Sequence, residues 1–188
     1  PLLSSWDSHH IRVSVKVHRS IQAANVLEDQ LGWRVAMPTI EELQASCDAG
    51  LHPQGSEGEQ PFCLLPFSHP IRRDDRRISG PLWTGPLFDQ DVLASMTVER
   101  AVALCGETAE PAVRHWVDEA ELATVPSLII TDMLPKFCEV TGPPKIVELV
   151  TGLKEAGYKA AVARWGAPAI RTDAPWPIVL KTTEACFD

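Results

Sequence analysis

Four arginines lie close together in the first half of the chain, and their side chains could bind phosphate groups. Only Asp74 and Asp75 interrupt them, and they are Arg72, Arg73, Arg76 and Arg77. Contacts between cationic side chains and phosphate oxygens supply most of the sequence-independent affinity of proteins for nucleic acid. The cluster is therefore a candidate RNA-contacting segment. The alternative is a solvated surface loop, because the two aspartates neutralise part of its charge.

A second candidate lies toward the end of the chain, where basic residues outnumber acidic ones. From Pro143 to Lys181 there are six lysines and arginines against three acidic residues. The candidates for RNA contact in this part are Lys159, Arg164 and Arg171. Asp173 is a hydrogen-bond acceptor, and it is expected to cap or pin the turn after a predicted hairpin rather than to meet a phosphate.

No arrangement typical of a catalytic or metal site occurs in the sequence. The five cysteines are widely spaced, without a CxxC pair, and there is no HxxxH or HExxH. His69 and His115 have no acid, base or nucleophile at a recognisable spacing. We therefore predict no catalytic residue and no bound metal. An odd number of scattered cysteines favours reduced thiols, and hence an intracellular compartment such as the cytoplasm, the nucleus or an organelle matrix.

The overall composition is that of a globular protein with an acidic body. Apolar residues make up 45% of the chain and charged residues 22%, which are ordinary values for a protein that buries a core. The 17 basic and 25 acidic residues give a net charge of −8. This charge argues against a free-standing nucleic-acid-binding protein and leaves room only for local basic faces. No apolar run is long enough for a membrane-spanning helix, so no membrane span is expected.

Alternating residues predict strands in the first half of the chain. In Ile11–His18 apolar residues alternate with polar ones, which predicts a half-buried strand. Its polar face, with Arg12, Lys16 and His18, is either solvated or in contact with RNA. Further strands are expected at 33–37, 62–67 and 80–87, short helices at 21–31 and 39–47, and a loop at 48–61. This order predicts an antiparallel sheet with one face covered by helices.

The stretch Gly80–Asp89, GPLWTGPLFD, separates the predicted strands from the helices. Its two Gly-Pro pairs predict a rigid turn, and Leu82 and Trp83 between them are expected to need burial. Asp89 is a natural N-cap for a helix at 89–105. Helices are also predicted at 111–123, 128–140 and 143–156, followed by a hairpin of strands at 159–164 and 169–172. The predicted fold class is α+β: a small antiparallel sheet with helices in residues 1–107, then a mainly helical, winged-helix-like unit with a C-terminal hairpin in residues 108–188.

Three segments resemble the C-terminal domain of the tRNA (guanine-N(2))-dimethyltransferase family. They are PLLSSWDSHHIRVSVKV at the start, GPLWTGPLFD in the middle and LKEAGYKAAVARWGAPAIRTDAP near the end, so the resemblance covers nearly the whole chain. In that family an N-terminal Rossmann-like domain binds S-adenosylmethionine and methylates a guanosine of tRNA, while the C-terminal domain helps to hold the tRNA. The resemblance implies a structural role for the motif residues Gly80, Pro81, Leu82, Trp83, Thr172, Asp173 and Pro175.

The resemblance implies a function that depends on a domain missing from these residues. No glycine-rich turn from a strand into a helix is present, so S-adenosylmethionine is expected to bind the catalytic domain of the full-length family and not this chain. The chain alone should then be non-catalytic. The implied partners are tRNA and either an N-terminal methyltransferase domain or another protein chain. The alternative is a non-catalytic interaction subunit that reuses the domain in a larger assembly.

One departure from the family concerns cysteines. Many members carry paired cysteines before the GPLW stretch, which suggests a zinc ribbon. Here the same interval holds only Cys47 and Cys63, neither of them in a pair. We therefore expect the loop to have kept its path and lost its metal.

Overall fold

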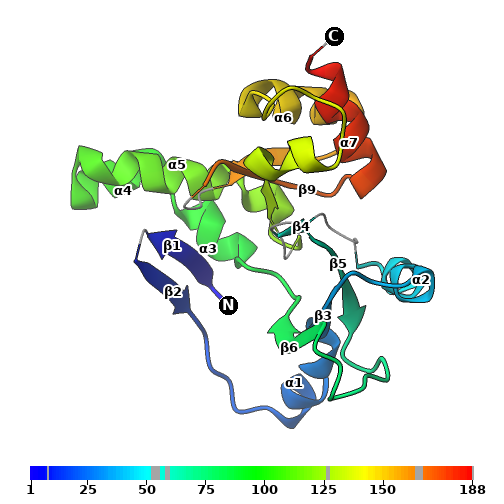
Figure 1. Ribbon diagram of the computed structural model, residues 1–188. Helices are drawn as coiled ribbons and strands as arrows, with labels where there is room; N and C mark the ends of the chain where they lie inside the picture. Colours follow the sequence, from blue (N-terminus) through cyan, green and yellow to red (C-terminus); the bar gives the residue numbers. More distant parts are fainter. Residues whose placement is uncertain (8, 52–55, 58–59, 126–127, 164–166, 188) are drawn as a thin grey trace.

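The structure is a computed structural model, and it describes residues 1–188 apart from 8, 52–55, 58–59, 126–127, 164–166 and 188 (Figure 1). The described residues form small antiparallel sheets packed with helices. The predicted α+β class is therefore confirmed. None of the helices in these residues combines the length and the apolar character that crossing a bilayer requires.

The chain begins with a two-stranded ribbon of β1 (Leu3–Asp7) and β2 (His10–Ser14), paired antiparallel. The strand predicted over Ile11–His18 thus forms only as far as Ser14. Its apolar face is not half-buried as predicted: Ile11 is 71% exposed and Val13 53%. The alternation correctly indicated a strand, but the described chain places no element over this face.

Residues after the ribbon form a short helix and a turn. Helix α1 (Ile21–Asn25) begins at Ser20, whose hydroxyl accepts a hydrogen bond from the Ala23 N–H. It is shorter than the predicted helix 21–31 and is followed by a 3-10 turn, η1 (Glu28–Gln30). Leu31, the last residue of the predicted helix, instead starts the next strand.

The second sheet contains four strands in the order β4-β5-β3-β6. They are β3 (Leu31–Ala36), β4 (Ser56–Glu57), β5 (Gln60–Pro66) and β6 (Ile78–Trp83). Helix α2 (Ile40–Asp48) packs on this sheet through Leu43 and Ala45, over a core of Val35, Cys63 and Leu65. Thr39 and Glu42 form a capping box that starts α2.

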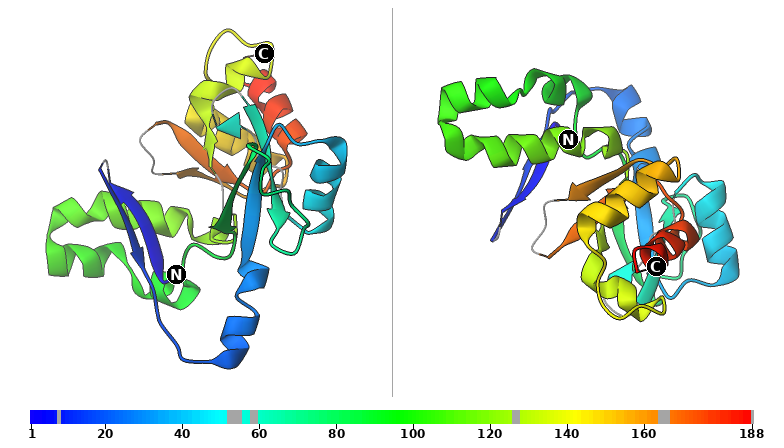
Figure 2. Two further views of the ribbon diagram at one scale, coloured as in Figure 1. Left: turned by 60° about the horizontal axis from the view of Figure 1, so that its bottom comes forward. Right: turned by 90° about the horizontal axis from the view of Figure 1, so that it is seen from above.

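Three helices follow β6, and both views of Figure 2 show two of them, α4 and α5, side by side and extending away from the sheets. The three are α3 (Gln90–Ser95), α4 (Val98–Cys105) and α5 (Glu110–Asp118), with 3-10 turns η2 (Glu107–Ala109) and η3 (Ala120–Leu122). Asp89 caps α3 as predicted. The single helix predicted over 89–105 is broken, because Met96 is extended and Thr97 caps α4 as a new helix.

These helices pack on the ribbon. Phe88, Leu93 and Ala123 form a buried cluster. The partly buried residues against it include Leu3 from β1 and Trp116 from α5. The cluster therefore includes residues on both sides of position 107, where the sequence predicts a domain boundary; that boundary stays a prediction.

The last part of the chain surrounds a three-stranded sheet in the order β7-β9-β8. Its elements are β7 (Ile129–Ile130), η4 (Thr131–Lys136), α6 (Ile146–Glu155), β8 (Ala160–Ala163), β9 (Ala169–Thr172) and α7 (Trp176–Ala185). The predicted hairpin is confirmed as β8 and β9, and the helix predicted at 143–156 as α6. Leu149, Leu153 and Ile170 are fully buried in its core.

Two parts of this region differ from the sequence prediction. The helix predicted at 128–140 is wrong: the segment starts as strand β7 and continues as a 3-10 helix that contains Pro135. A proline inside a helix lacks the N–H that an α-helical hydrogen bond needs. Helix α7, which follows Pro175, was not predicted at all, although its Val179 is fully buried.

Candidate RNA-contacting surfaces

The arginine segment forms the connection between β5 and β6. Arg72, Arg73 and Arg76 are exposed there. Arg72 pairs with Asp74 at 3.2 Å, but both side chains are largely in solvent, where such a pair is weak and exchangeable. The three guanidinium groups are therefore available to a ligand at the surface.

Arg77 has a different position from its three neighbours. Its Nη2 lies 2.6 Å from Asp75 Oδ2 and 3.2 Å from Glu42 Oε1, and its Nη1 donates to the Met37 carbonyl at 3.1 Å. Hydrogen bonds from Arg77 lower the pKa of Asp75 below its usual value. We therefore assign Arg77 to holding the base of the segment against the start of α2, and not to RNA contact as predicted.

Arg171, one of the RNA contacts predicted near the hairpin, is buried in the structure. It is only 7% exposed, its Nε donates to Glu119 Oε2 at 3.2 Å, and its Nη1 donates to the Val125 carbonyl at 2.6 Å. Burial lowers the pKa of Arg171, and the Glu119 carboxylate opposes that shift. A guanidinium enclosed in this way cannot reach a phosphate, so the prediction that Arg171 contacts RNA is wrong. The strand pattern around it gave no sign that its side chain points inward.

The other described residues singled out near the hairpin either lie at the surface or hold the hairpin together. Lys159 is exposed, whereas Arg164 lies outside the described residues. Asp173 Oδ1 accepts the Lys159 N–H at 2.8 Å, and Thr172 Oγ1 donates to the Lys159 carbonyl at 2.6 Å. Asp173 therefore pins the hairpin, as predicted, but at its open end, and Pro175 directly precedes α7.

The GPLW stretch is a structural unit. Gly80 has φ +133°, and a Cβ there would lie 3.0 Å from the Gly32 carbonyl oxygen, so glycine is needed at this position. Trp83 Nε1 donates to the Pro86 carbonyl at 3.0 Å, and its ring lies so close to Gly85 that a Cβ there would be 2.8 Å away. Pro81 and Leu82 are exposed, so the expectation that Leu82 needs burial is wrong.

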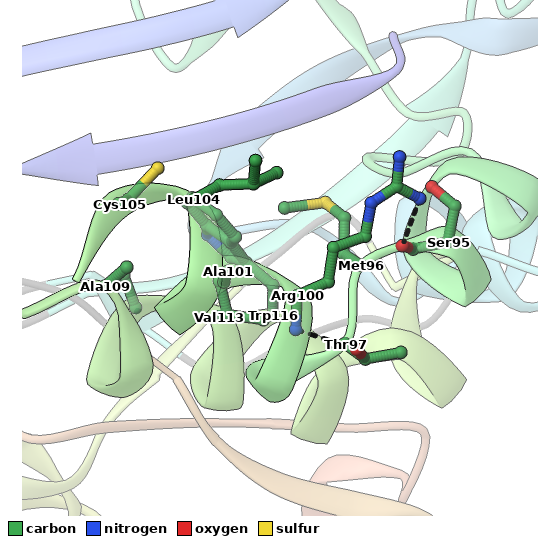
Figure 3. A pocket seen from close by; sticks show the side chains of 11 residues that line it. Ser95, Met96, Thr97, Arg100, Ala101, Leu104, Cys105, Ala109, Val113 and Trp116 are labelled. Atoms are coloured by element: carbon green, nitrogen blue, oxygen red, sulfur yellow. Dashed lines mark hydrogen bonds between the residues drawn. The ribbon is translucent and has the colours of Figure 1, made fainter. Parts of the chain in front are cut away.

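A pocket of about 400 Å³ lies between α4 and α5, and its lining is largely apolar (Figure 3). Met96, Val113 and Trp116 line it, and Arg100, whose guanidinium donates to the Ser95 carbonyl at 3.5 Å, is its charged residue. The residues that line it include no carboxylate and no histidine. This lining can hold an apolar group, and among the described residues that form it the Cys105 thiol is the one group that could transfer a proton.

Within the described part of the chain, no three histidine, cysteine or acidic side chains come together in a way that could hold a metal ion. Cys63 is buried and Cys47 is exposed, while His52 lies outside the described residues. The absence of zinc stays a prediction.

Comparisons with known proteins give one consistent result. Residues 1–184 match a family model described as N2,N2-dimethylguanosine tRNA methyltransferase. A tRNA (guanine(26)-N(2))-dimethyltransferase of Methanocorpusculum labreanum is 28% identical over 184 residues, which are 95% of this chain and 44% of that protein. The same enzyme of Aeropyrum pernix is 29% identical over 188 residues, which are 96% of this chain and 42% of that protein.

A solved structure shares the fold. Trm1 from Pyrococcus horikoshii, solved with S-adenosyl-L-methionine, superposes with a TM-score of 0.72 at 20% identity. The superposition covers 96% of this chain and 42% of that one. The chain thus spans less than half the length of the relatives that it matches.

Proposed function

Because the chain belongs to the N2,N2-dimethylguanosine tRNA methyltransferase family, we propose that it is the C-terminal, tRNA-holding part of such an enzyme. The observation that carries the proposal is the family match over residues 1–184 in a chain that spans only 42–44% of two such relatives. The catalytic portion, which binds S-adenosylmethionine, then lies outside these residues. On this proposal the chain alone transfers no methyl group.

We further infer that the last part of the chain is a winged-helix-like unit. The order α5, β7, η4, α6, β8, β9 places helices before a hairpin, and β7 pairs with β9 to complete a small sheet. This arrangement of helix, turn, helix and hairpin is used by many nucleic-acid-binding domains. It supports Lys159, which directly precedes β8, as an RNA contact, while Arg164 is proposed from the sequence alone.

The main RNA contact is proposed to be the arginine segment. Arg72, Arg73 and Arg76 project from a connection whose base is fixed by Arg77. Cationic side chains on a fixed backbone can meet successive phosphates without first ordering the loop. The contacts would give affinity and orientation rather than sequence specificity.

The test compares a polypeptide that joins a methyltransferase portion to residues 1–188 with the methyltransferase portion alone. We expect the joined protein to bind tRNA more tightly, with a steeper dependence on salt, because it adds phosphate contacts. Calorimetric binding of S-adenosylmethionine should be equal for the two proteins and absent for residues 1–188 alone. Equal tRNA affinity of the two proteins would contradict the proposal.

The net charge of −8 favours one competing function, a non-catalytic interaction subunit that reuses this domain. An acidic body repels RNA outside the local basic surfaces. A chain that changes neither the tRNA affinity nor its salt dependence, yet binds a protein partner, would support this second function.

A further inference from the structure

The segment from β2 to η1 exposes a row of aliphatic side chains that the fold leaves uncovered. We call this row the apolar stripe; its members are Ile11, Val13, Val15, Val17, Ile21, Val26 and Leu27, each between 48% and 87% exposed. Figure 1 shows the segment as a blue strand and connection that leads away from the helices to α1. Single exposed aliphatic residues are common, but seven of them within 17 residues of one segment indicate an interaction surface.

The strand register shows that the first two residues of the stripe face away from the helices. Leu3 pairs with Ser14 and packs into the cluster of Phe88 and Leu93. Residues directly opposite in an antiparallel pair lie on the same face, and neighbours along a strand alternate. Ile11 and Val13 therefore lie on the outer face of the ribbon, opposite the face that Leu3 packs against the helices.

The segment from β2 to α1 also contributes no side chain to the buried clusters of the described residues. None of the buried clusters in the described residues includes a residue of the stripe. Helix α1 has five residues and buries none of them. A single helical turn is marginal in water, whereas β2 is held only through its pairing with β1, whose Leu3 packs against the helices. A cover would therefore stabilise α1 and the outer face of β2.

The charge of the segment indicates what kind of cover fits. The stripe itself, residues 11–27, holds Arg12, Lys16 and Arg19 and no aspartate or glutamate, while the two acidic residues of the segment, Glu28 and Asp29, lie at its end in η1. A complementary surface is then apolar at its centre with acidic residues at its rim, as in a protein interface.

We propose that the apolar stripe is the docking surface for the methyltransferase portion of the enzyme. More than half of each matched relative lies outside the region that this chain spans. The fold match to the Pyrococcus horikoshii protein covers 96% of the present chain and 42% of that one, so in that protein the same fold is part of a chain more than twice as long. The inference rests on the proposed function only for the identity of the partner.

The inference is tested by amide hydrogen exchange of residues 1–188. Exchange is measured with and without a separately produced methyltransferase portion of a family member from the same organism. We expect addition of that portion to slow exchange in residues 10–27 at least about tenfold, because docking buries these amides. Val17→Asp should weaken the association about tenfold or more, since it places a charge in an apolar contact. Val17 is 87% exposed and lies outside the described helices and strands, so the variant leaves the fold intact.

The matched control is Val147→Asp on α6, which replaces another valine that is 67% exposed. It should leave the association unchanged. Three results would overturn the inference: no association, protection confined to other elements, or protection of residues 10–27 by concentration alone, which would identify a second copy as the occupant.

A parallel arm adds tRNA to residues 1–188 without the methyltransferase portion. Protection of residues 10–27 by tRNA would also overturn the inference, because the stripe would then be an RNA surface. Docking without any effect on tRNA affinity would instead contradict the proposed function and leave the docking surface in place. The two failures are therefore distinguishable.

Discussion

Arg171 and Glu119 form an ion pair inside the protein, with Nε and Oε2 3.2 Å apart although 52 residues separate them. They are 7% and 5% exposed. The pair joins β9 to the end of α5, where Glu119 is the C-terminal cap residue. Replacing Arg171 by methionine leaves the Glu119 carboxylate buried without this partner. We expect the free energy of unfolding, measured in urea, to fall by about 3–5 kcal/mol.

The double variant Arg171→Met, Glu119→Leu separates the two contributions to this cost. It removes both charges, so the loss should be clearly smaller than in the single variant. A single variant that loses less than about 1 kcal/mol would show that solvent reaches the pair.

A second prediction concerns Arg72 and Arg73. Replacing both by alanine in a protein that contains the methyltransferase portion should weaken binding of all tRNAs and reduce the slope of log affinity against log salt by about one to two. Fluorescence anisotropy with labelled tRNA at several salt concentrations measures both. Arg114→Ala is the control, because Arg114 is also exposed and also paired, with Glu110 on α5. An unchanged slope with intact binding would favour the interaction-subunit function.

A third prediction concerns the reactivity of the cysteines. Burial raises the pKa of Cys63 to about 12, while Cys47 and Cys105 are exposed. The thiolate is the reactive form, so a thiol reagent at pH 8 should label Cys47 and Cys105 rapidly and Cys63 only after unfolding. Mass spectrometry of the native and urea-unfolded chain locates the label. Rapid native labelling of Cys63 would contradict the packing of α2 on β5.

A fourth prediction follows from the Arg77 contact with Asp75. Hydrogen bonds from Arg77 lower the pKa of Asp75 from its usual 3.8. A depressed carboxyl pKa stabilises the fold above the unfolded value, and this contribution is lost as the pH falls through the folded value. Arg77→Met should therefore reduce the drop in the urea midpoint between pH 6 and pH 3. Arg76→Met, at an exposed neighbour, should keep the wild-type drop.

Local signals in the sequence predicted most of the elements but few of their environments. The acceptor at Asp89 and the alternation in Ile11–His18 depend only on neighbouring residues, and they correctly predicted a helix start and a strand, although the strand ends at Ser14. Burial depends on what packs from elsewhere. For that reason Val13 was expected inside and is exposed, whereas Arg171 was expected at the surface and is buried.

The candidate site shows the same limit. Asp173 was assigned correctly because its acceptor role acts within one hairpin. The roles of Arg77 and Arg171 depend on Glu42 and Glu119, which are 35 and 52 residues away in sequence. A charge count cannot reveal partners at such separations. The pocket between α4 and α5 was not predicted from the sequence for a related reason, since it exists only when the helices lie side by side.

Strand β7 has a consequence for the order in which the last part of the chain folds. Strands β8 and β9 are neighbours in sequence, so their hairpin can form from local contacts. Ile129 of β7 pairs with Ile170, which closes a loop of about forty residues and carries the corresponding entropic cost. Thr131 adds a backbone and a hydroxyl hydrogen bond to the Pro168 carbonyl, and Ile129 is buried in the core only once the sheet has formed. We therefore expect β7 to join the sheet after the hairpin has formed and to leave it first when the protein opens.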